Sequence, residues 1–188
     1  MLLVREPSDQ EIRAFLATWT NEPFSYPEVG GTRGDAPPGY VVDHNRVRLG
    51  SGRDVFERAV GALRRWEMFR LGWLRQCDTE APIEAGVTVA VLVHRFGVWS
   101  LNVCRIVYVI DEPRRFAFAY GTLAEHAERG EERFSVEWLT GDDSVWYDIF
   151  AFSRPQQLLA RIGRPFARHL QREFARDSLA AMKRAVDR

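Results

Sequence analysis

Five runs rich in β-forming residues follow one another between residues 87 and 153, and this pattern most constrains the fold. The runs cover residues 87–95, 98–110, 115–122, 131–139 and 144–153. Turn signals separate neighbouring runs, for example Asp111-Glu112-Pro113 and residues 140–143, and they favour antiparallel pairing of consecutive strands. We therefore expect one antiparallel sheet built from this half of the chain.

A long amphipathic helix is predicted to follow the last strand, from Ser153-Arg154-Pro155 to about Val186. Its apolar stripe consists of Leu158, Leu159, Ile162, Phe166, Leu170 and Phe174. Pro165 lies inside this pattern, so we expect a kink or a break near residues 161–164. Strands followed by a helix predict an α+β domain in which a curved antiparallel sheet grips the C-terminal helix. Such an arrangement leaves a cavity wherever side chains do not fill the space between the two.

The first third of the chain predicts two shorter helices and an arm. Ser8 and Glu11 form the pattern of a capping box, and a helix is expected after them. Residues 23–40 are rich in proline and glycine, which predicts an extended arm. A strand over residues 40–49 and a helix over residues 53–71 come next. We divide the chain into an N-terminal helical extension, residues 1–22, and a single domain, residues 23–188.

Composition narrows the class of protein. The chain has 188 residues, of which 46% are hydrophobic and 28% charged, and it holds two cysteines, Cys77 and Cys104. No stretch reaches the ~18 consecutive apolar residues of a spanning helix, and the N-terminus lacks the pattern of a signal peptide. Two cysteines are too few for a disulfide framework or a cysteine metal site. We expect a soluble cytoplasmic protein without a transmembrane segment, a bound metal or a cofactor.

Positive charge gathers at the C-terminus although the net charge of the chain is zero. Residues 154–188 hold nine basic and three acidic side chains, and five arginines recur along the predicted helix at positions 161, 164, 168, 172 and 176. This arginine stripe could bind nucleic acid or an anionic membrane surface. A solvated outer helix face is the favoured interpretation, because Glu173 and Asp177 interrupt the charge and the same helix is needed for the core.

Three motifs resemble those of a known family. They are Phe24-Ser25-Tyr26-Pro27-Glu28-Val29-Gly30 with Thr32-Arg33-Gly34 and Pro37-Pro38-Gly39-Tyr40; Tyr120-Gly121-Thr122-Leu123 with His126 and Gly130-Glu131-Glu132-Arg133-Phe134; and Val145-Trp146-Tyr147 with Ala151-Phe152-Ser153-Arg154-Pro155. In this order they are similar to the domain of unknown function 1990 family of bacteria and plants, over residues 23–187. The resemblance implies the START and Bet v 1-like helix-grip fold, with a cavity for an apolar or aromatic molecule. Some relatives in that superfamily carry ligands, and others are cyclases, aromatases or hydrolases, so function depends on this chain's own polar residues.

Ionisable side chains concentrate between two predicted strands, at His126, Glu128, Glu131 and Glu132. A histidine near a carboxylate can act as a general acid/base pair, since imidazole titrates near neutral pH. One histidine with glutamates could also hold a divalent ion, but oxygen-rich sites favour more ligands. The simplest interpretation is a charged, solvated hairpin loop.

Further candidates lie on the strands and on the arm. Tyr120, Thr122, Asp148 and Ser153 would orient a mostly apolar ligand if they face the cavity. Alternatively, Asp148 points to solvent and Tyr120 packs in the core. Arg33 could bind a carboxylate or phosphate, or it could pair with a surface acid. The predicted ligand-binding set is Tyr120, Thr122, His126, Glu131, Asp148, Ser153 and Arg33, and the catalytic candidates are His126, Glu131 and Tyr120.

Three functions are compatible with these residues. The favoured one is binding of a small apolar or aromatic molecule, in a cavity walled by Phe116, Phe118, Phe134, Trp138, Trp146, Phe150 and the final helix. The second is a cavity enzyme, cyclase- or hydrolase-like, in which His126 or a nearby carboxylate is the base and Tyr120 or Arg33 stabilises charge on a carbonyl oxygen. The third is an electrostatic binder that uses the arginine stripe.

Overall fold

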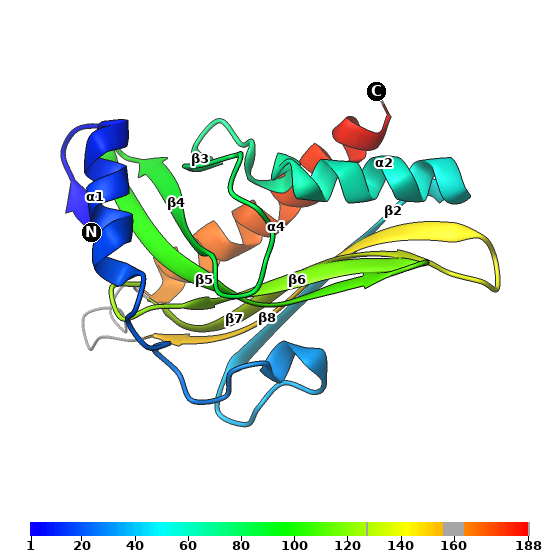
Figure 1. The fold of residues 1–188 in the computed structure, drawn as a ribbon, viewed down its shortest axis with the longest axis horizontal. Helices are drawn as coiled ribbons and strands as arrows, with labels where there is room; N and C mark the ends of the chain where they lie inside the picture. The colour runs from blue at the N-terminus through cyan, green and yellow to red at the C-terminus, as the bar shows by residue number, and fades with distance from the viewer. Residues whose placement is uncertain (127, 156–163, 188) are drawn as a thin grey trace.

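The predicted strands pair into one curved antiparallel sheet (Figure 1). The structure is a computed structural model, and it describes residues 1–126, 128–155 and 164–187. Within these residues eight strands form the sheet in the order β2-β8-β7-β6-β5-β4-β3, and β1 pairs with β5. The strands are β1 (Leu2–Leu3), β2 (Val41–Ser51), β3 (Leu74–Gln76), β4 (Thr88–Arg95), β5 (Val98–Glu112), β6 (Arg115–Thr122), β7 (Glu128–Trp138) and β8 (Ser144–Pro155).

The predicted strand runs are confirmed, and they differ from the structure mainly at their ends. The five runs correspond to β4 to β8, which are joined by short hairpins, and the strand predicted over residues 40–49 is β2. Strand β2 is far from β8 in sequence but pairs with it, and this places β2 at one edge of the sheet. Strand β3 was not predicted, because it is only three residues long.

Helix α1 (Asp9–Trp19) begins with the predicted capping box. The Ser8 hydroxyl accepts from the Glu11 backbone N–H at 3.3 Å, and the Ser8 N–H donates to the Glu11 carboxylate at 2.8 Å. The helix buries Ile12 in a small apolar cluster with Ala90, Leu92 and Leu101 of β4 and β5. Residues 1–22 therefore pack directly on the sheet.

Helix α2 (Arg53–Arg64) is shorter than the predicted helix over residues 53–71. The chain leaves the helix at Trp66, which has a left-handed conformation with φ of 57°, and the short 3-10 helix η2 (Glu67–Phe69) follows. The buried Trp66 ring donates from its indole N–H to the carbonyl oxygen of Ala81 at 3.2 Å. Burial of this large ring fixes the turn, a tertiary effect that helical periodicity does not contain.

Helix α4 (Arg164–Val186) packs along α2 and η2 on one face of the sheet. The prediction that Pro155 begins the helix is wrong, because β8 continues to Pro155 and pairs there with Glu128. A kink or a break is predicted near residues 161–164. Residues 161–163 lie outside the described part of the structure, and Arg164 is the first residue of α4.

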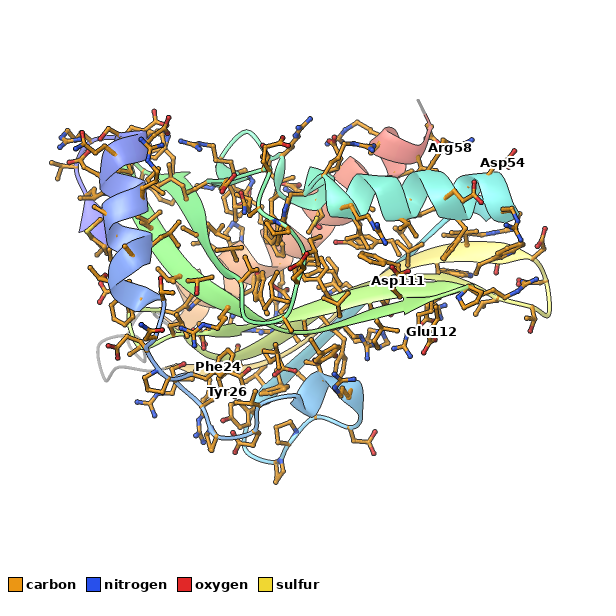
Figure 2. All side chains as sticks on the ribbon, in the orientation of Figure 1. Phe24, Tyr26, Asp54, Arg58, Asp111 and Glu112 are labelled. Carbon is orange, nitrogen blue, oxygen red and sulfur yellow. The ribbon has the colours of Figure 1, made fainter. Side chains whose placement is uncertain are left out.

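The two faces of the sheet have different partners. Figure 1 shows α2 and α4 on one face, whereas the arm from residue 20 to residue 40, with its 3-10 helix η1 (Gly31–Arg33), crosses the other. In Figure 2, Phe24 and Tyr26 of the arm lie across the sheet from Asp54 and Arg58 of α2. Alternation along each strand therefore decides whether a side chain meets the helices or the arm. No helix in the described ranges is long and apolar enough to cross a membrane.

Candidate functional site

A cavity of about 260 Å³ lies between the sheet and α4. Aromatic and aliphatic side chains make up most of its wall: Phe69, Trp73, Leu74, Val91, Val93, Ile149, Leu170, Phe174 and Ala175. Polar groups face it from the strands and from α4, and they include Asp43, Asn45, Asn102, Tyr120, Glu132, Ser153 and Gln171. A mostly apolar wall with a few polar groups is the usual composition of a small-molecule site.

The cavity occupies a different part of the fold from the one predicted. Phe116, Phe118 and Phe134 belong to the packed core, and Trp138 packs against Phe56 of α2. Trp146 and Phe150 lie on the other face of the sheet, where Arg46 and Arg133 stack over their rings. None of these six predicted wall residues lines the cavity within the described residues. Helix α2 and Trp66 fill the space beneath β6 and β7, so the cavity remains only beside Phe69 and the first half of α4.

Glu132 and Tyr120 form a hydrogen-bonded pair on the cavity wall. Tyr120 on β6 and Glu132 on β7 are opposite each other in the sheet register. The Tyr120 hydroxyl donates to Glu132 Oε2 at 2.7 Å. The pKa of Glu132 is raised to about 7, mainly by burial and to a smaller extent by the neighbouring Asp43 carboxylate, and the hydrogen bond from Tyr120 opposes this shift. The pKa of Tyr120 is raised well above its usual value, first by burial and then by the Glu132 charge.

A second polar group lies at the α4 side of the cavity. Arg168 donates to both carboxylate oxygens of Asp43 and also to the side-chain oxygen of Gln171 at 2.8 Å. The Gln171 amide in turn donates to the Ser153 hydroxyl at 3.3 Å. These bonds connect α4 to β2 and β8, and they occupy Arg168 of the predicted stripe.

Two further arginines of the stripe, Arg172 and Arg176, do not line the cavity. Arg176 pairs with Asp177 at 2.9 Å and with Glu173 at 3.7 Å, and Arg172 is exposed. Arg161 and the side chain of Arg164 lie outside the described part of the structure.

His126 and Thr122 line the cavity but are engaged by nearby backbone groups. His126 Nδ1 accepts from the Glu128 N–H at 3.1 Å, and burial lowers the pKa of His126 to about 4. The ring is therefore neutral at physiological pH. The Thr122 hydroxyl bonds to the backbone of Gly130 and approaches Ser25 Oγ at 2.7 Å.

Glu131 turns to the opposite face of the sheet, although it follows Glu132 directly. Its side chain is only 2% exposed and holds the arm. The carboxylate accepts from Tyr26 Oη at 2.7 Å, Gly30 N at 2.7 Å, Thr32 N at 3.0 Å and Thr32 Oγ1 at 2.5 Å. Among the described residues, the Glu131 carboxylate thus accepts four hydrogen bonds from the arm.

Gly121 makes room for this arm. A Cβ atom at position 121 would lie 2.1 Å from Tyr26 Oη and 2.9 Å from the Phe24 ring. The Tyr-Gly-Thr sequence therefore contributes to both faces: Tyr120 lines the cavity, and Gly121 lets Tyr26 reach Glu131.

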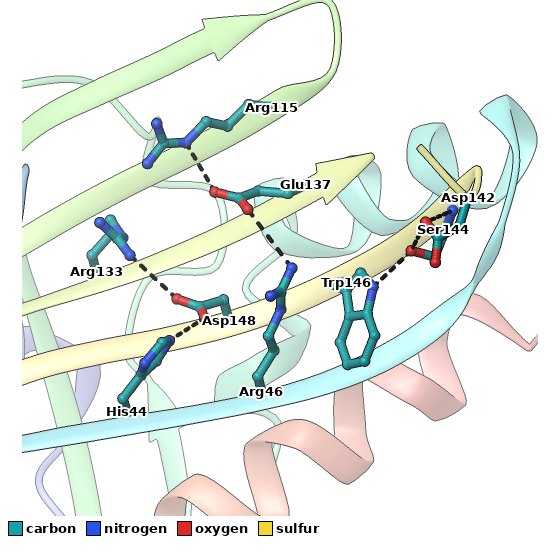
Figure 3. A network of polar contacts seen from close by, with 9 residues as sticks. All are labelled: His44, Arg46, Arg115, Arg133, Glu137, Asp142, Ser144, Trp146 and Asp148. Atoms are coloured by element: carbon teal, nitrogen blue, oxygen red, sulfur yellow. Dashed lines mark hydrogen bonds and ion pairs between the residues drawn. The ribbon is translucent and has the colours of Figure 1, made fainter. Parts of the chain in front are cut away.

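Asp148 and Arg33 also lie on the arm face. Figure 3 shows Asp148 between His44 and Arg133; the distances are 2.5 Å to His44 Nε2 and 3.3 Å to Arg133 Nη2. Arg133 also donates to the Thr32 carbonyl oxygen at 2.7 Å, so this group helps to hold the arm. The Arg33 guanidinium stacks over the Tyr108 ring at 3.9 Å from its centre.

The structure thus separates the predicted site residues into two groups. Tyr120, Thr122, His126 and Ser153 line the cavity; Glu131 also borders it, but its carboxylate is bonded to the arm, and the side chains of Asp148 and Arg33 lie on the arm face. The prediction missed Glu132 as a cavity residue, although the signal was present. Phe134, Val136 and Trp138 were assigned to one strand face, and two residues back along that face is Glu132 rather than Glu131.

No group of three His, Cys, Asp or Glu side chains in the described residues could hold a metal ion. Cys104 lines the cavity, and burial raises the pKa of its thiol well above the usual value. The chemistry that the wall offers is therefore that of a buried carboxyl group with a phenol beside it.

Comparison with known proteins gives a consistent picture. The model of the family described as "Domain of unknown function (DUF1990)" matches residues 25–181. A UPF0548 protein of Deinococcus radiodurans is 37% identical over 99% of this chain and 99% of its own length, and one of Dictyostelium discoideum is 35% identical over 99% and 96%. The START superfamily protein from Mycobacterium smegmatis has a similar fold, with a TM-score of 0.53, 13% identity, and coverage of 79% of this chain and 98% of that chain.

Proposed function

This chain belongs to the DUF1990 family, and from that premise we propose that it binds a small apolar or aromatic molecule in the cavity between the sheet and α4. The family match and the START-like helix-grip fold are compatible with ligand binding but name no ligand. The proposal depends on one observation, the cavity of about 260 Å³ with its apolar and aromatic wall.

The size of the cavity supports a small ligand. Small-molecule sites usually enclose roughly 300–1,000 Å³, and this cavity lies just below that range. A molecule with one or two rings suits such a volume, whereas a long-chain lipid does not. The stacked rings of Phe69 and Phe174, 5.5 Å apart, provide a flat wall for an aromatic ring.

A cavity enzyme is the second candidate, and one observation favours it. The pKa of Glu132 is raised to about 7, which is the range in which a carboxyl group exchanges protons efficiently at neutral pH. In this version Glu132 replaces His126 as the acid or base, because a pKa of about 4 makes His126 a weak base and its Nδ1 already accepts a backbone hydrogen bond. Tyr120 is the adjacent hydroxyl, and Arg33 has no part in it because it lies on the arm.

Two alanine-to-leucine substitutions on α4 test the proposed function. Ala175 lines the cavity, whereas Ala180 is exposed on the same helix. Ala175→Leu places an isobutyl group in the space that the ligand would occupy. We expect saturation-transfer NMR to detect indole binding to the wild type and to Ala180→Leu, and to find it reduced about tenfold or more in Ala175→Leu.

Circular dichroism and urea unfolding would show that both variants remain folded. Equal indole binding by Ala175→Leu and Ala180→Leu would contradict the proposal, because the ligand would then lie outside the cavity. Absence of indole binding to the wild type would count against it as well.

A further inference from the structure

We propose that the ligand of this cavity carries a basic nitrogen, and that its protonated amine pairs with the Glu132 carboxylate while its apolar part lies against Phe69, Trp73 and Phe174. This inference rests on the proposed function, because it names the chemical class of the molecule that the cavity binds.

The first argument is the free side of the Glu132 carboxyl group. Oε2 accepts from Tyr120, but Oε1 makes no hydrogen bond to any group in the described residues. Glu132 keeps some accessible surface, and the space it faces is the cavity. A carboxylate oxygen that is open to a mostly apolar cavity can form a strong charge-assisted hydrogen bond with a donor that enters the cavity. A ligand amine in the cavity provides that donor.

The second argument is the sign of the charges around Glu132. Among the described residues, the cavity wall has no arginine or lysine, and the Glu132 carboxyl group faces the cavity with one oxygen that no protein group bonds. Arg168 is the cation at the α4 side, and both of its terminal nitrogens are bonded to Asp43. The wall therefore favours a positive ligand.

The other titratable groups facing Glu132 do not change this balance. They come from each neighbouring element: Tyr120 on β6, Cys104 on β5 and Tyr147 on β8. Burial raises the pKa of each of these groups well above its usual value, so all three are neutral at physiological pH. His126 at the end of the cavity is neutral too, because its pKa is about 4.

Other ligand classes fit the wall less well. A carboxylate or phosphate would be repelled by the Glu132 carboxylate, and no arginine or lysine among the described wall residues would offset this repulsion. A carbonyl group needs a donor, and the Tyr120 hydroxyl already donates to Glu132. A protonated amine that carries an aromatic group gains binding free energy in two ways. Its cation pairs with the Glu132 carboxylate, and it can also lie against the aromatic rings of the wall.

Binding of a cation must also change the protonation of Glu132. With a pKa of about 7, the empty site holds a mixture of acid and carboxylate at neutral pH. The amine pairs with the carboxylate, so the acid fraction loses its proton to the buffer when the ligand binds. Binding should therefore release a fraction of a proton per ligand at pH 7.

Three indoles of matched shape test the inference. Tryptamine carries an ammonium group, 3-ethylindole has no charge, and indole-3-propanoate carries a carboxylate. We expect isothermal titration calorimetry at pH 7 to show tryptamine binding about tenfold or more tightly than 3-ethylindole, and indole-3-propanoate binding most weakly. Titrations in phosphate and in Tris should give different heats for tryptamine, in the sense of proton release.

Glu132→Gln should bring the affinity for tryptamine to within about threefold of that for 3-ethylindole and should abolish the proton release. Glu137→Gln is the matched control, because Glu137 lies on the same strand but pairs with Arg115 and Arg46 on the arm face (Figure 3). It should leave the preference for tryptamine intact.

The outcomes separate the two proposals. Equal binding of tryptamine and 3-ethylindole by the wild type, or a preference for tryptamine that survives Glu132→Gln, would overturn the inference and leave the proposed function standing. If none of the three indoles binds, both fail.

Discussion

Glu132 gives the folded state an unusual dependence on pH. Its pKa is raised from 4.5 to about 7 on folding, so the native state holds this proton more tightly than the unfolded chain. Below pH 4.5 Glu132 is protonated in both the folded and the unfolded state, so it does not lower the free energy of unfolding. As the pH rises from about 4.5 to about 7 the unfolded chain ionises first, and stability is lost. The full cost, on the order of 3 kcal/mol, is present above pH 7.

Glu132→Gln should remove this loss, because glutamine does not ionise and its amide oxygen can still accept from Tyr120. Relative to the wild type, the variant should gain about 3 kcal/mol between pH 4.5 and pH 8. Urea unfolding of both proteins across this range provides the measurement. A difference between them that stays constant with pH, or one that falls as the pH rises, would contradict the raised pKa.

The contrast between Glu131 and Glu132 shows how far sequence reasoning reaches for single residues. The sequence indicated that this acidic stretch matters, and strand alternation implied that only one of the two glutamates faces the helices. It could not show that the arm folds back to supply four donors to Glu131, because those donors lie about a hundred residues away in the chain.

The arm is held to the sheet mainly through the buried carboxylate of Glu131. Tyr26, Gly30 and Thr32 all donate to it, and Arg133 binds the Thr32 carbonyl oxygen from the sheet side. Four donors around one carboxylate replace the water that it loses on burial. The arm is therefore an integral layer of the fold, and together with α1 it covers the face of the sheet opposite α2 and α4.

Glu131→Gln should loosen the arm while leaving the cavity intact. The NH₂ group of the glutamine would face the N–H and O–H donors of the arm where a carboxylate oxygen now accepts from them. This should lower the free energy of unfolding by roughly 2–3 kcal/mol. Tyr26→Phe removes one of the four donors and should cost about 1 kcal/mol. Urea unfolding measures both, and hydrogen exchange at Gly30 and Thr32 reports the arm directly.

Glu112→Gln, at an exposed position, controls for the substitution itself. Unchanged exchange at Gly30 and Thr32 in Glu131→Gln would contradict the assignment of Glu131 as the anchor of the arm.

The prediction for the region after α2 shows where local patterns are insufficient. The apolar spacing of residues 53–71 is helical, yet the chain turns at Trp66 so that its ring reaches Phe118 at 5.1 Å between centres. That contact joins residues more than fifty positions apart. The five consecutive strands were predictable because each is amphipathic or buried over its whole length and is bounded by turn residues.

The molecule as a whole is a sheet with two unlike faces. Helices α2 and α4 cover one face and leave a cavity, while α1 and the arm cover the other. The order of elements was enough to predict this class of fold, and the resemblance of three motifs agreed with it. The position of the cavity depended on which large rings fill the rest of the space, and Trp66 and Phe69 decide this through long-range packing.

Methyl NMR during a titration with indole tests the central claim, that this cavity holds a small apolar or aromatic molecule. The methyl groups of Val91, Val93 and Ile149 line the cavity, whereas Val42 and Val98 are exposed on the outside of the sheet. The account predicts that indole shifts the signals of Val91, Val93 and Ile149 and leaves those of Val42 and Val98 in place. Shifts confined to the exposed valines, or none up to the solubility of indole, would contradict it.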